Sequence, residues 1–391
     1  MATVILNVDR EHKVRNFYPW VYQHEVQAVE GEAAPGDVVQ VKSARGQLLG
    51  RAFYNPSSHI PLRMLTLDPE EAIHRAFFEQ RLAAAIARRQ GRIGNTDAVR
   101  LVYAEADALP GLVVDSLAGH LVLQIRNHGM ERARDEIVRA LKRLLSPPGI
   151  YERSDMQARE EEGMAPYTGL LWGQVPERLE IFEDDIRFEV SIRAGQKTGF
   201  YMDQRDNRRL LRSLVKPGDR VLDVYSYTGG FGLHAARAGA QVLAVDKDGE
   251  ALQLLEANAR RNGLADRVGA RWGDAIEVLG HLARENRRFT HIVLDPPTLA
   301  KHKNDVPRVK GLFTEMMTGA LRALDPGGLV LLSTCAYHIS PDDLIESARM
   351  AANDLHRRLE VLTITYQPAD HPWIIQLPET LYLKTVVLKS D

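Results

Sequence analysis

A glycine-containing segment just past the middle of the chain constrains the fold more than any other feature. It runs from Asp223 through Gly229 and Gly230 to Gly232, directly after a strand-like stretch and before a helical one. Glycines at such a junction let the backbone turn sharply and approach a ligand closely. Strand and helix patterns alternate from about residue 190 onward, and this alternation predicts a doubly wound, mostly parallel α/β sheet.

The expected strands of this sheet are short apolar runs separated by helical patterns. They cover residues 220–225, 241–246, 268–272, 291–295 and 329–334. Two further strands, at 362–366 and 381–388, form a hairpin-like pair near the end of the chain. An antiparallel final strand distinguishes methyltransferase sheets from dinucleotide-binding ones. We therefore predict a Rossmann-like class I methyltransferase domain over residues 189–391.

Acidic residues at successive strand ends indicate which cofactor this sheet binds. Asp246 ends the second strand, where a carboxylate can accept hydrogen bonds from ribose hydroxyls, and Asp274 follows the third, near the expected adenine. The loop lacks the G-x-G-x-x-G spacing that favours a pyrophosphate. Asp223 would repel a diphosphate but suits the cationic methionine end of S-adenosylmethionine. The alternatives are a generic βαβ turn and a nicotinamide dinucleotide site. The expected S-adenosylmethionine contacts are Asp223, Tyr225, Ser226, Thr228, Gly229, Gly230, Asp246, Lys247, Asp274, Ala275 and Asp295.

Two motifs at the ends of the fourth and fifth strands suggest the chemistry. They are Asp295-Pro296-Pro297 and Cys335, the single cysteine of the chain. A thiolate that adds to C6 of a pyrimidine makes C5 nucleophilic enough to take a methyl group. Asp295 would hydrogen-bond the base, and the paired prolines would stiffen the loop that holds it. The alternatives are a small buried cysteine, a strand-terminating turn, or methylation of an exocyclic amine, which Thr298 in place of an aromatic residue disfavours.

Several segments together resemble bacterial 23S ribosomal RNA cytosine-5 methyltransferases that carry an N-terminal PUA domain. The most specific is 197–208, which matches K-T-G-[FY]-Y-x-D-Q-R; the others are 225–231, 294–297, 333–335, 370–372 and 378–384. The resemblance covers essentially the whole chain. It implies that Cys335 is the nucleophile and Asp295 the acid that positions the base. It also implies that Lys197 and Gln204 reach the cofactor or target nucleotide, and that the substrate contacts are Pro296, Pro297, Phe200, Arg205 and His371.

The chain departs from its chemical relatives at two places. Many cytosine-5 RNA methyltransferases use a second cysteine after the two prolines to release the product, but Thr298 stands there. His338 is a candidate base for release, although a role in capping the next helix is the favoured interpretation. Lys310-Gly311 replaces the Tyr-Lys pair that the family usually shows, which leaves any cofactor role of that helix open.

The first part of the chain has a different pattern. Short strands divided by Gly and Pro over residues 1–70 predict a small β-barrel, which resembles a PUA domain, and residues 71–188 an α+β domain. By this resemblance the barrel binds RNA, although a packing or dimerisation barrel is the alternative. Its expected RNA-facing side chains are Arg15, Phe17, Tyr18, Trp20, Arg51 and Arg63. A basic helix over residues 132–145 is expected to be a solvated face.

The composition indicates the cellular compartment but does not identify the substrate. The net charge of −2, from 50 basic and 52 acidic residues, neither demands nor excludes a nucleic acid. One cysteine excludes a disulfide within the chain, and we expect a cytoplasmic homodimer without a membrane span or a metal. The predicted function is S-adenosylmethionine-dependent formation of 5-methylcytosine in large-subunit (23S) ribosomal RNA, naked or in a partly assembled subunit. The rivals are methylation of a purine amine and a non-catalytic RNA-binding assembly factor.

Overall fold

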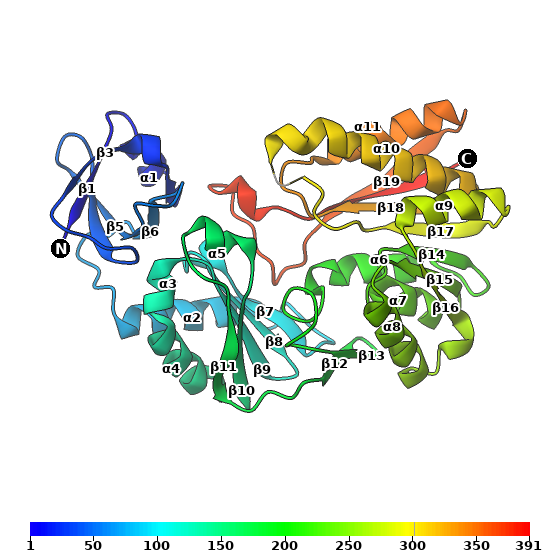
Figure 1. Ribbon diagram of the computed structural model, residues 1–391, viewed down its shortest axis with the longest axis horizontal. Coiled ribbons are helices and arrows are strands. Elements are labelled where there is room, and N and C mark those ends of the chain that lie inside the picture. Colours follow the sequence, from blue (N-terminus) through cyan, green and yellow to red (C-terminus); the bar gives the residue numbers. More distant parts are fainter. Residues whose placement is uncertain (301) are drawn as a thin grey trace. The chain divides into compact units, whose positions relative to one another are not determined.

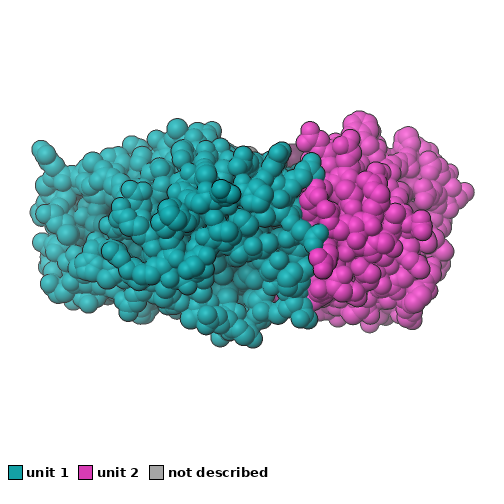
Figure 2. All heavy atoms as spheres, turned by 90° about the horizontal axis from the view of Figure 1, so that it is seen from below, with its two compact units in different colours: residues 1–182, 190–202, 369–380 teal, residues 183–189, 203–368, 381–391 magenta. Residues whose placement is uncertain are grey.

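The computed structural model describes residues 1–300 and 302–391. The chain divides into two compact units, coloured separately in Figure 2: residues 1–182, 190–202 and 369–380 form the first, and 183–189, 203–368 and 381–391 the second. These units interleave along the sequence, so the three-domain division with boundaries at residues 70 and 188 stays a prediction. No helix in the described ranges is long and apolar enough to cross a bilayer.

The first unit begins with a six-stranded sheet that curls on itself (Figure 1) in the order β2-β6-β5-β4-β1-β3. Its strands are β1 (Thr3–Leu6), β2 (Trp20–Val21), β3 (Val26–Glu30), β4 (Val38–Lys42), β5 (Leu48–Tyr54) and β6 (Leu62–Thr66), with helix α1 (Glu11–Arg15) after β1. Alternate residues of β4, Val39 and Val41, are buried inside the curl. This arrangement agrees with the barrel-like domain expected from the short strands.

A second sheet of the first unit has the order β11-β10-β9-β8-β7. Its strands are β7 (Ala98–Tyr103), β8 (Leu112–Leu117), β9 (His120–Ile125), β10 (Gly149–Ser154) and β11 (Tyr167–Gly173). The helices of this region are α2 (Arg75–Arg89), α3 (His128–Arg132), α4 (Arg134–Leu145) and α5 (Gln157–Glu161), and α2 packs against α4. The helix expected over roughly 132–145 is α4, which begins at Arg134, whereas Arg132 is the last residue of α3.

The second unit holds the seven-stranded sheet β16-β15-β14-β17-β18-β20-β19. Its strands are β14 (Arg220–Val224), β15 (Gln241–Asp246), β16 (Val268–Trp272), β17 (Phe289–Leu294), β18 (Leu324–Thr334), β19 (Leu359–Tyr366) and β20 (Lys384–Ser390). All neighbours are parallel except β20, which is antiparallel to both β18 and β19. The expected hairpin-like pair is confirmed, because β19 and β20 are antiparallel neighbours, and β20 joins this pair to β18.

Helices cover both faces of this sheet (Figure 1): α6, α7 and α8 lie on one side and α9, α10 and α11 on the other. They are α6 (Arg205–Leu214), α7 (Gly230–Arg237), α8 (Gly249–Arg261), α9 (Ala275–Arg284), α10 (Val306–Ala323) and α11 (Pro341–Asp354). A short antiparallel pair, β12 (Leu179–Glu183) and β13 (Ile186–Val190), precedes them. Apolar residues of β14, β17 and β18 pack with α9, α10 and α11 into one core. The doubly wound architecture predicted from the sequence is confirmed.

Candidate active site

The ends of the central strands lie side by side because their registers coincide. Val224 of β14 pairs with Val245 of β15 and with Leu294 of β17, and Leu294 pairs with Leu332 of β18. The loops after these strands therefore leave the sheet at one edge, where open α/β sheets bind their ligands. Asp246, Asp295 and Cys335 follow these paired positions at that edge.

The turn between β14 and α7 has the backbone geometry that its glycines predict. Gly229 has a φ of 90° and begins α7, and a side chain there would approach Leu255 to 2.9 Å. The amide of Gly232 donates to Oδ2 of the fully buried Asp223 at 2.8 Å. Tyr225 and Tyr227 also adopt positive φ, an uncommon conformation for residues with side chains. The backbone of this turn is therefore held in one defined conformation.

Three buried polar atoms of this turn have no hydrogen-bond partner among the residues that the structure describes. They are Oδ1 of Asp223, Oγ of Ser226 and Oγ1 of Thr228. A buried polar group without a partner costs free energy, and such groups in a folded protein call for an explanation. A ligand with an ammonium and a carboxylate, as at the methionine end of S-adenosylmethionine, supplies partners for all three. The residues present therefore fit the expected cofactor.

The protonation of Asp223 is linked to that ligand. Burial, with a smaller contribution from the neighbouring carboxylates of Asp295 and Asp246, raises the pKa of Asp223 to about 7. A ligand ammonium beside the carboxylate would favour its ionised form and draw the pKa back down. A cationic ligand thus relieves the electrostatic cost of this buried acid.

A cavity of about 200 Å³ continues from the turn along the ends of β15 and β16. Asp246 accepts hydrogen bonds from the amides of Tyr227, at 2.8 Å, and Asp248, at 3.0 Å, which fix its carboxylate at the cavity wall. Asp274 caps α9, accepting from the amide of Ile276 at 2.9 Å. The cavity is lined by Tyr225, Val245, Asp246, Lys247, Gly273, Asp274, Ala275, Ile276, Pro297, Leu299, Leu312 and Met316.

Five apolar residues of this lining were not among the expected contacts: Val245, Ile276, Leu299, Leu312 and Met316. Leu312 and Met316 lie one turn apart on α10, a spacing that cannot be distinguished from ordinary core packing. The hydroxyl of Tyr225 donates to the sulfur of Met316 at 3.3 Å, which ties the glycine turn to this helix. A slot with apolar walls and carboxylates at one side suits an adenosine group.

Asp295 is held by a residue that precedes the sheet. Gln204 Nε2 donates to Asp295 Oδ1 at 2.8 Å, and Gln204 Oε1 accepts from Asn207 at 2.6 Å. Asn207 also donates to Thr385 of β20 at 2.9 Å, whose hydroxyl lies 2.7 Å from that of Ser333. The network joins the β17 end to the β18 strand that carries Cys335. Gln204, which was expected to reach the cofactor or the target nucleotide, contacts Asp295, itself one of the expected cofactor contacts.

Cys335 is half-buried and lies against the loop that follows the two prolines. Its sulfur is 3.0 Å from the hydroxyl of Thr298. Lys384 of β20, which the sequence analysis left without a role, donates to the carbonyls of Ala336 at 3.0 Å and Tyr337 at 3.1 Å. Burial lowers the pKa of Lys384 to about 8, an effect that the nearby Cys335 opposes. The thiol thus has a hydroxyl and a buried ammonium as neighbours.

Three of the expected substrate contacts are not accessible. Arg205 is 1% exposed and lies 3.7 Å from the carboxylate of Glu183. Phe200 and His371 are buried in the first unit, where His371 Nδ1 lies 3.0 Å from Asp370 Oδ1. A side chain buried in this way supports the fold and cannot contact RNA unless the fold rearranges. Lys197, also in the first unit, lies 4.1 Å above the Tyr201 ring.

The remaining expectations concern residues that do not line this cavity. Ser340, and not His338, caps α11 by accepting from the amide of Asp343. Lys310 pairs with Asp343 at 3.0 Å and so links α10 to α11. Basic residues of α4 pair with carboxylates at the surface, for example Arg139 with Asp135 at 4.0 Å, as expected for a solvated face.

Two family models match the chain. Residues 4–67 match a PUA-like domain, and residues 107–372 match an S-adenosylmethionine-dependent methyltransferase. The first match covers the curled sheet, and the second includes the glycine turn, Asp295 and Cys335.

Curated relatives of similar length match over the whole chain. The ribosomal RNA large subunit methyltransferase I of Tolumonas auensis is 37% identical over 100% of this chain and 99% of its own. That of Shewanella denitrificans is also 37% identical, over 98% of each chain.

Solved structures share the fold over the full length. A putative S-adenosylmethionine-dependent methyltransferase from Streptococcus mutans matches with a TM-score of 0.84 at 22% identity, covering 100% of both chains. A putative methyltransferase complexed with SAH matches with a TM-score of 0.86, also at 22% identity and full coverage.

Proposed function

Because the chain belongs to the ribosomal RNA large subunit methyltransferase I family and is an S-adenosylmethionine-dependent methyltransferase, we propose that it methylates C5 of a cytosine in large-subunit (23S) ribosomal RNA. The observation that carries the choice of cytosine C5 is the placement of Cys335 and Asp295 at adjacent strand ends, beside the cofactor turn. Methylation of an amine needs no thiol there. Methylation of a pyrimidine at C5 needs one, because the ring carbon is otherwise too weak a nucleophile.

The cofactor, when bound, supplies an electrophilic methyl group at this edge of the sheet. Asp223, Ser226 and Thr228 would hold its amino-acid end, because their buried polar atoms need partners. Asp246 and Asp274 would hold the ribose and adenine in the slot that Leu312 and Met316 wall off.

Cys335 acts on the base. Its thiolate adds to C6 of the cytosine, the electron pair of the C5–C6 double bond forms a double bond between C4 and C5, and the C4–N3 π pair moves onto N3, which takes up a proton. The resulting enamine is nucleophilic at C5. After C5 has gained the methyl group, a base removes its proton, the double bond forms again and the thiolate leaves. Asp295, oriented by Gln204, hydrogen-bonds the N3/N4 edge of the base, which places C6 against the sulfur. The target must leave its stack to reach Cys335, at a cost of a few kcal/mol.

The test is to incubate the protein with labelled S-adenosylmethionine and ribosomal RNA and to map the methylated nucleotide by mass. We expect 5-methylcytosine, and we expect RNA containing 5-fluorocytosine to trap a covalent adduct with wild-type protein but not with Cys335→Ala. Methylation that survives Cys335→Ala would overturn the covalent mechanism. Methylation of a purine amine would overturn the choice of base. Comparing naked RNA with partly assembled subunits as substrates identifies which one is used.

We also propose a three-domain division, with residues 1–70 as the RNA-binding PUA-like barrel, 71–188 as the central domain and 189–391 as the catalytic domain. A homodimer in the cytoplasm is the assembly and location that the family resemblance favours. Light scattering coupled to size-exclusion chromatography tests the dimer, and limited proteolysis tests the boundaries.

A further inference from the structure

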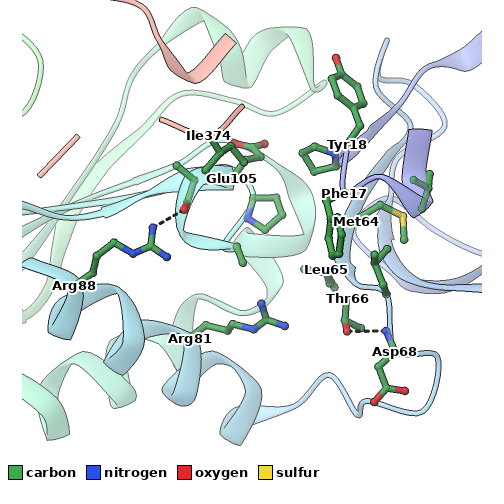
Figure 3. A pocket seen from close by; sticks show the side chains of 16 residues that line it. Phe17, Tyr18, Met64, Leu65, Thr66, Asp68, Arg81, Arg88, Glu105 and Ile374 are labelled. Atoms are coloured by element: carbon green, nitrogen blue, oxygen red, sulfur yellow. Dashed lines mark hydrogen bonds between the residues drawn. The ribbon is translucent and has the colours of Figure 1, made fainter. Parts of the chain in front are cut away.

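A second cavity lies within the first unit, and the proposed reaction uses none of the residues that line it. It measures about 460 Å³ and is built by the curled sheet, helix α2 and the short helix η2 (Ala104–Asp107), as Figure 3 shows. Its volume lies in the range of sites that hold small organic ligands. Three of its side chains, Phe17, Glu105 and Arg88, have properties that point to one ligand class (Figure 3).

Phe17 offers an open aromatic face. It follows α1, lines the cavity and is 66% exposed, whereas phenylalanine side chains are usually buried. Its φ of 66° is an uncommon backbone conformation for a bulky residue. Aromatic rings exposed in this way are the surfaces on which unpaired nucleobases stack.

Glu105 supplies an acceptor that the protein leaves open. Its side chain is 8% exposed, and its Oε1 accepts from Trp20 Nε1 at 2.9 Å and from Arg63 at 3.1 Å. Within residues 1–300 and 302–391, its Oε2 makes no hydrogen bond. A buried carboxylate held on one oxygen and open on the other is a fixed acceptor for an N–H donor of a ligand.

Two arginines of α2, Arg81 and Arg88, also line the cavity. Arg81 pairs with Glu71 at 3.3 Å, and Arg88 donates to the carbonyl of Ala106 at 2.8 Å and pairs with Asp107 at 3.0 Å. Both guanidinium groups stay partly exposed and keep further N–H donors for a phosphate. Asp68 also lines the cavity, and its Oδ1 accepts from the amide of Glu70.

We propose that this cavity binds one unstacked nucleotide whose base carries an exocyclic amino group. The base stacks on Phe17 and donates its amino N–H to Glu105 Oε2, while Arg81 and Arg88 face the phosphate. Uracil is disfavoured, because carbonyl oxygens flank its only N–H and would face the carboxylate. The proposal rests on the proposed function only in taking an RNA strand as the natural source of the nucleotide.

The experiment measures binding of fluorescently labelled oligoadenylate and oligouridylate to the full chain by anisotropy, without methyl transfer. We expect wild-type protein to prefer oligoadenylate. Phe17→Ala should weaken its binding about tenfold, the usual effect of removing one stacking platform. Glu105→Gln should abolish the preference over oligouridylate, while its amide oxygen can still accept from Trp20 and Arg63.

Matched controls are Trp172→Ala, an exposed aromatic residue of β11, and Arg139→Ala, an exposed cation of α4; neither lines the cavity. Both should bind oligoadenylate as the wild type does. Competition with adenosine 5′-monophosphate distinguishes an RNA strand from a free nucleotide as the natural ligand. If displacement needs a concentration far above the Kd of the oligonucleotide, the ligand is a strand. If displacement occurs at a concentration similar to that Kd, the ligand is a free nucleotide.

Oligoadenylate binding that is unchanged in Phe17→Ala, or an adenylate preference that survives in Glu105→Gln, would overturn the proposal. These outcomes are independent of the methylation test, because binding here needs neither Cys335 nor the cofactor. Thermal unfolding serves as a folding control, and S-adenosylmethionine affinity should be unchanged, since the variants lie in the first unit and the cofactor turn in the second.

Discussion

The hydroxyl of Thr298 lies 3.0 Å from the sulfur of Cys335, at the position where many cytosine-5 RNA methyltransferases carry a second cysteine. A hydroxyl at this distance can donate to a thiolate and stabilise it, although it is too weak an acid or base to replace a thiol in full. The thiol therefore contacts a hydroxyl of the loop that follows β17, and Lys384 of β20 donates a hydrogen bond to the backbone just after Cys335.

Replacing Thr298 should reduce the reactivity of the thiol. We expect Thr298→Val to slow alkylation of Cys335 by iodoacetamide at neutral pH about tenfold, because a hydrogen bond to a charged group contributes about 1.5–3 kcal/mol. Thr298→Ser keeps the hydroxyl and should retain most of the rate. Cys335 is the single cysteine, so the alkylation rate reports on it alone. Equal rates in Thr298→Val and wild-type protein would show that the hydroxyl does not stabilise the thiolate.

Removing the charge of Lys384 should move the pH profile of the same reaction. An ammonium near Cys335 favours the thiolate, so Lys384→Met is expected to shift the alkylation profile toward higher pH. Burial lowers the pKa of Lys384 to about 8, so wild-type protein itself loses this charge above that pH. The difference between the two proteins should therefore be largest below pH 8 and shrink above it. Lys384→Arg, which keeps its charge above pH 8, should preserve a gap to Lys384→Met until the thiol is fully ionised in both variants.

The ionised Asp223 should lower the free energy of unfolding of the protein when no cofactor is bound. Its pKa is about 7 in the fold against 3.8 for the free side chain, so the folded state holds a proton that the unfolded state releases between these values. Stability must fall as the pH rises through that window, by roughly a few kcal/mol. We expect Asp223→Asn to raise the melting temperature at pH 8 but much less at pH 4, and to weaken S-adenosylmethionine binding. A rise in melting temperature on Asp223→Asn that is as large at pH 4 as at pH 8 would contradict this origin.

Gln204 should act through Asp295 and not through the cofactor. Gln204→Leu removes the 2.8 Å hydrogen bond to Asp295 and leaves the carboxylate free to turn. We expect kcat/KM for RNA to fall at least about tenfold, the size of one lost hydrogen bond to a charged group, while the Kd for S-adenosylmethionine changes little. Calorimetry with the cofactor and steady-state kinetics with RNA separate the two effects. A parallel loss of cofactor affinity would assign Gln204 to the cofactor site instead.

Much of the candidate site follows from local patterns. Apolar runs with strand periodicity predicted β14, β15 and β17 to within two residues and the carboxyl end of β18, which begins five residues earlier than expected. Parallel strands bring these carboxyl ends to one edge. Asp246, Asp295 and Cys335 could therefore be placed together before any contact was known. The predicted strand 220–225 was one residue too long, because Tyr225 takes a positive φ that no strand pattern reveals.

The roles of charged residues before the sheet could not be predicted in this way. Arg205 and Gln204 are adjacent in one motif, yet Arg205 is buried against Glu183 while Gln204 contacts Asp295. Sequence spacing says which face of a helix a residue occupies, but not which distant chain segment covers that face. The same limit hid Lys384, whose partners lie across an antiparallel pairing.

The sequence by itself determined the layered α/β architecture, the strand-end positions of the carboxylates and cysteine, and the family, because these depend on periodicity and short motifs. Only the tertiary structure decided which polar groups are buried without partners, which arginines are accessible, and that a cavity joins Phe17, Glu105 and Arg88. These properties depend on packing between segments far apart in the chain, such as Asn207 against Thr385.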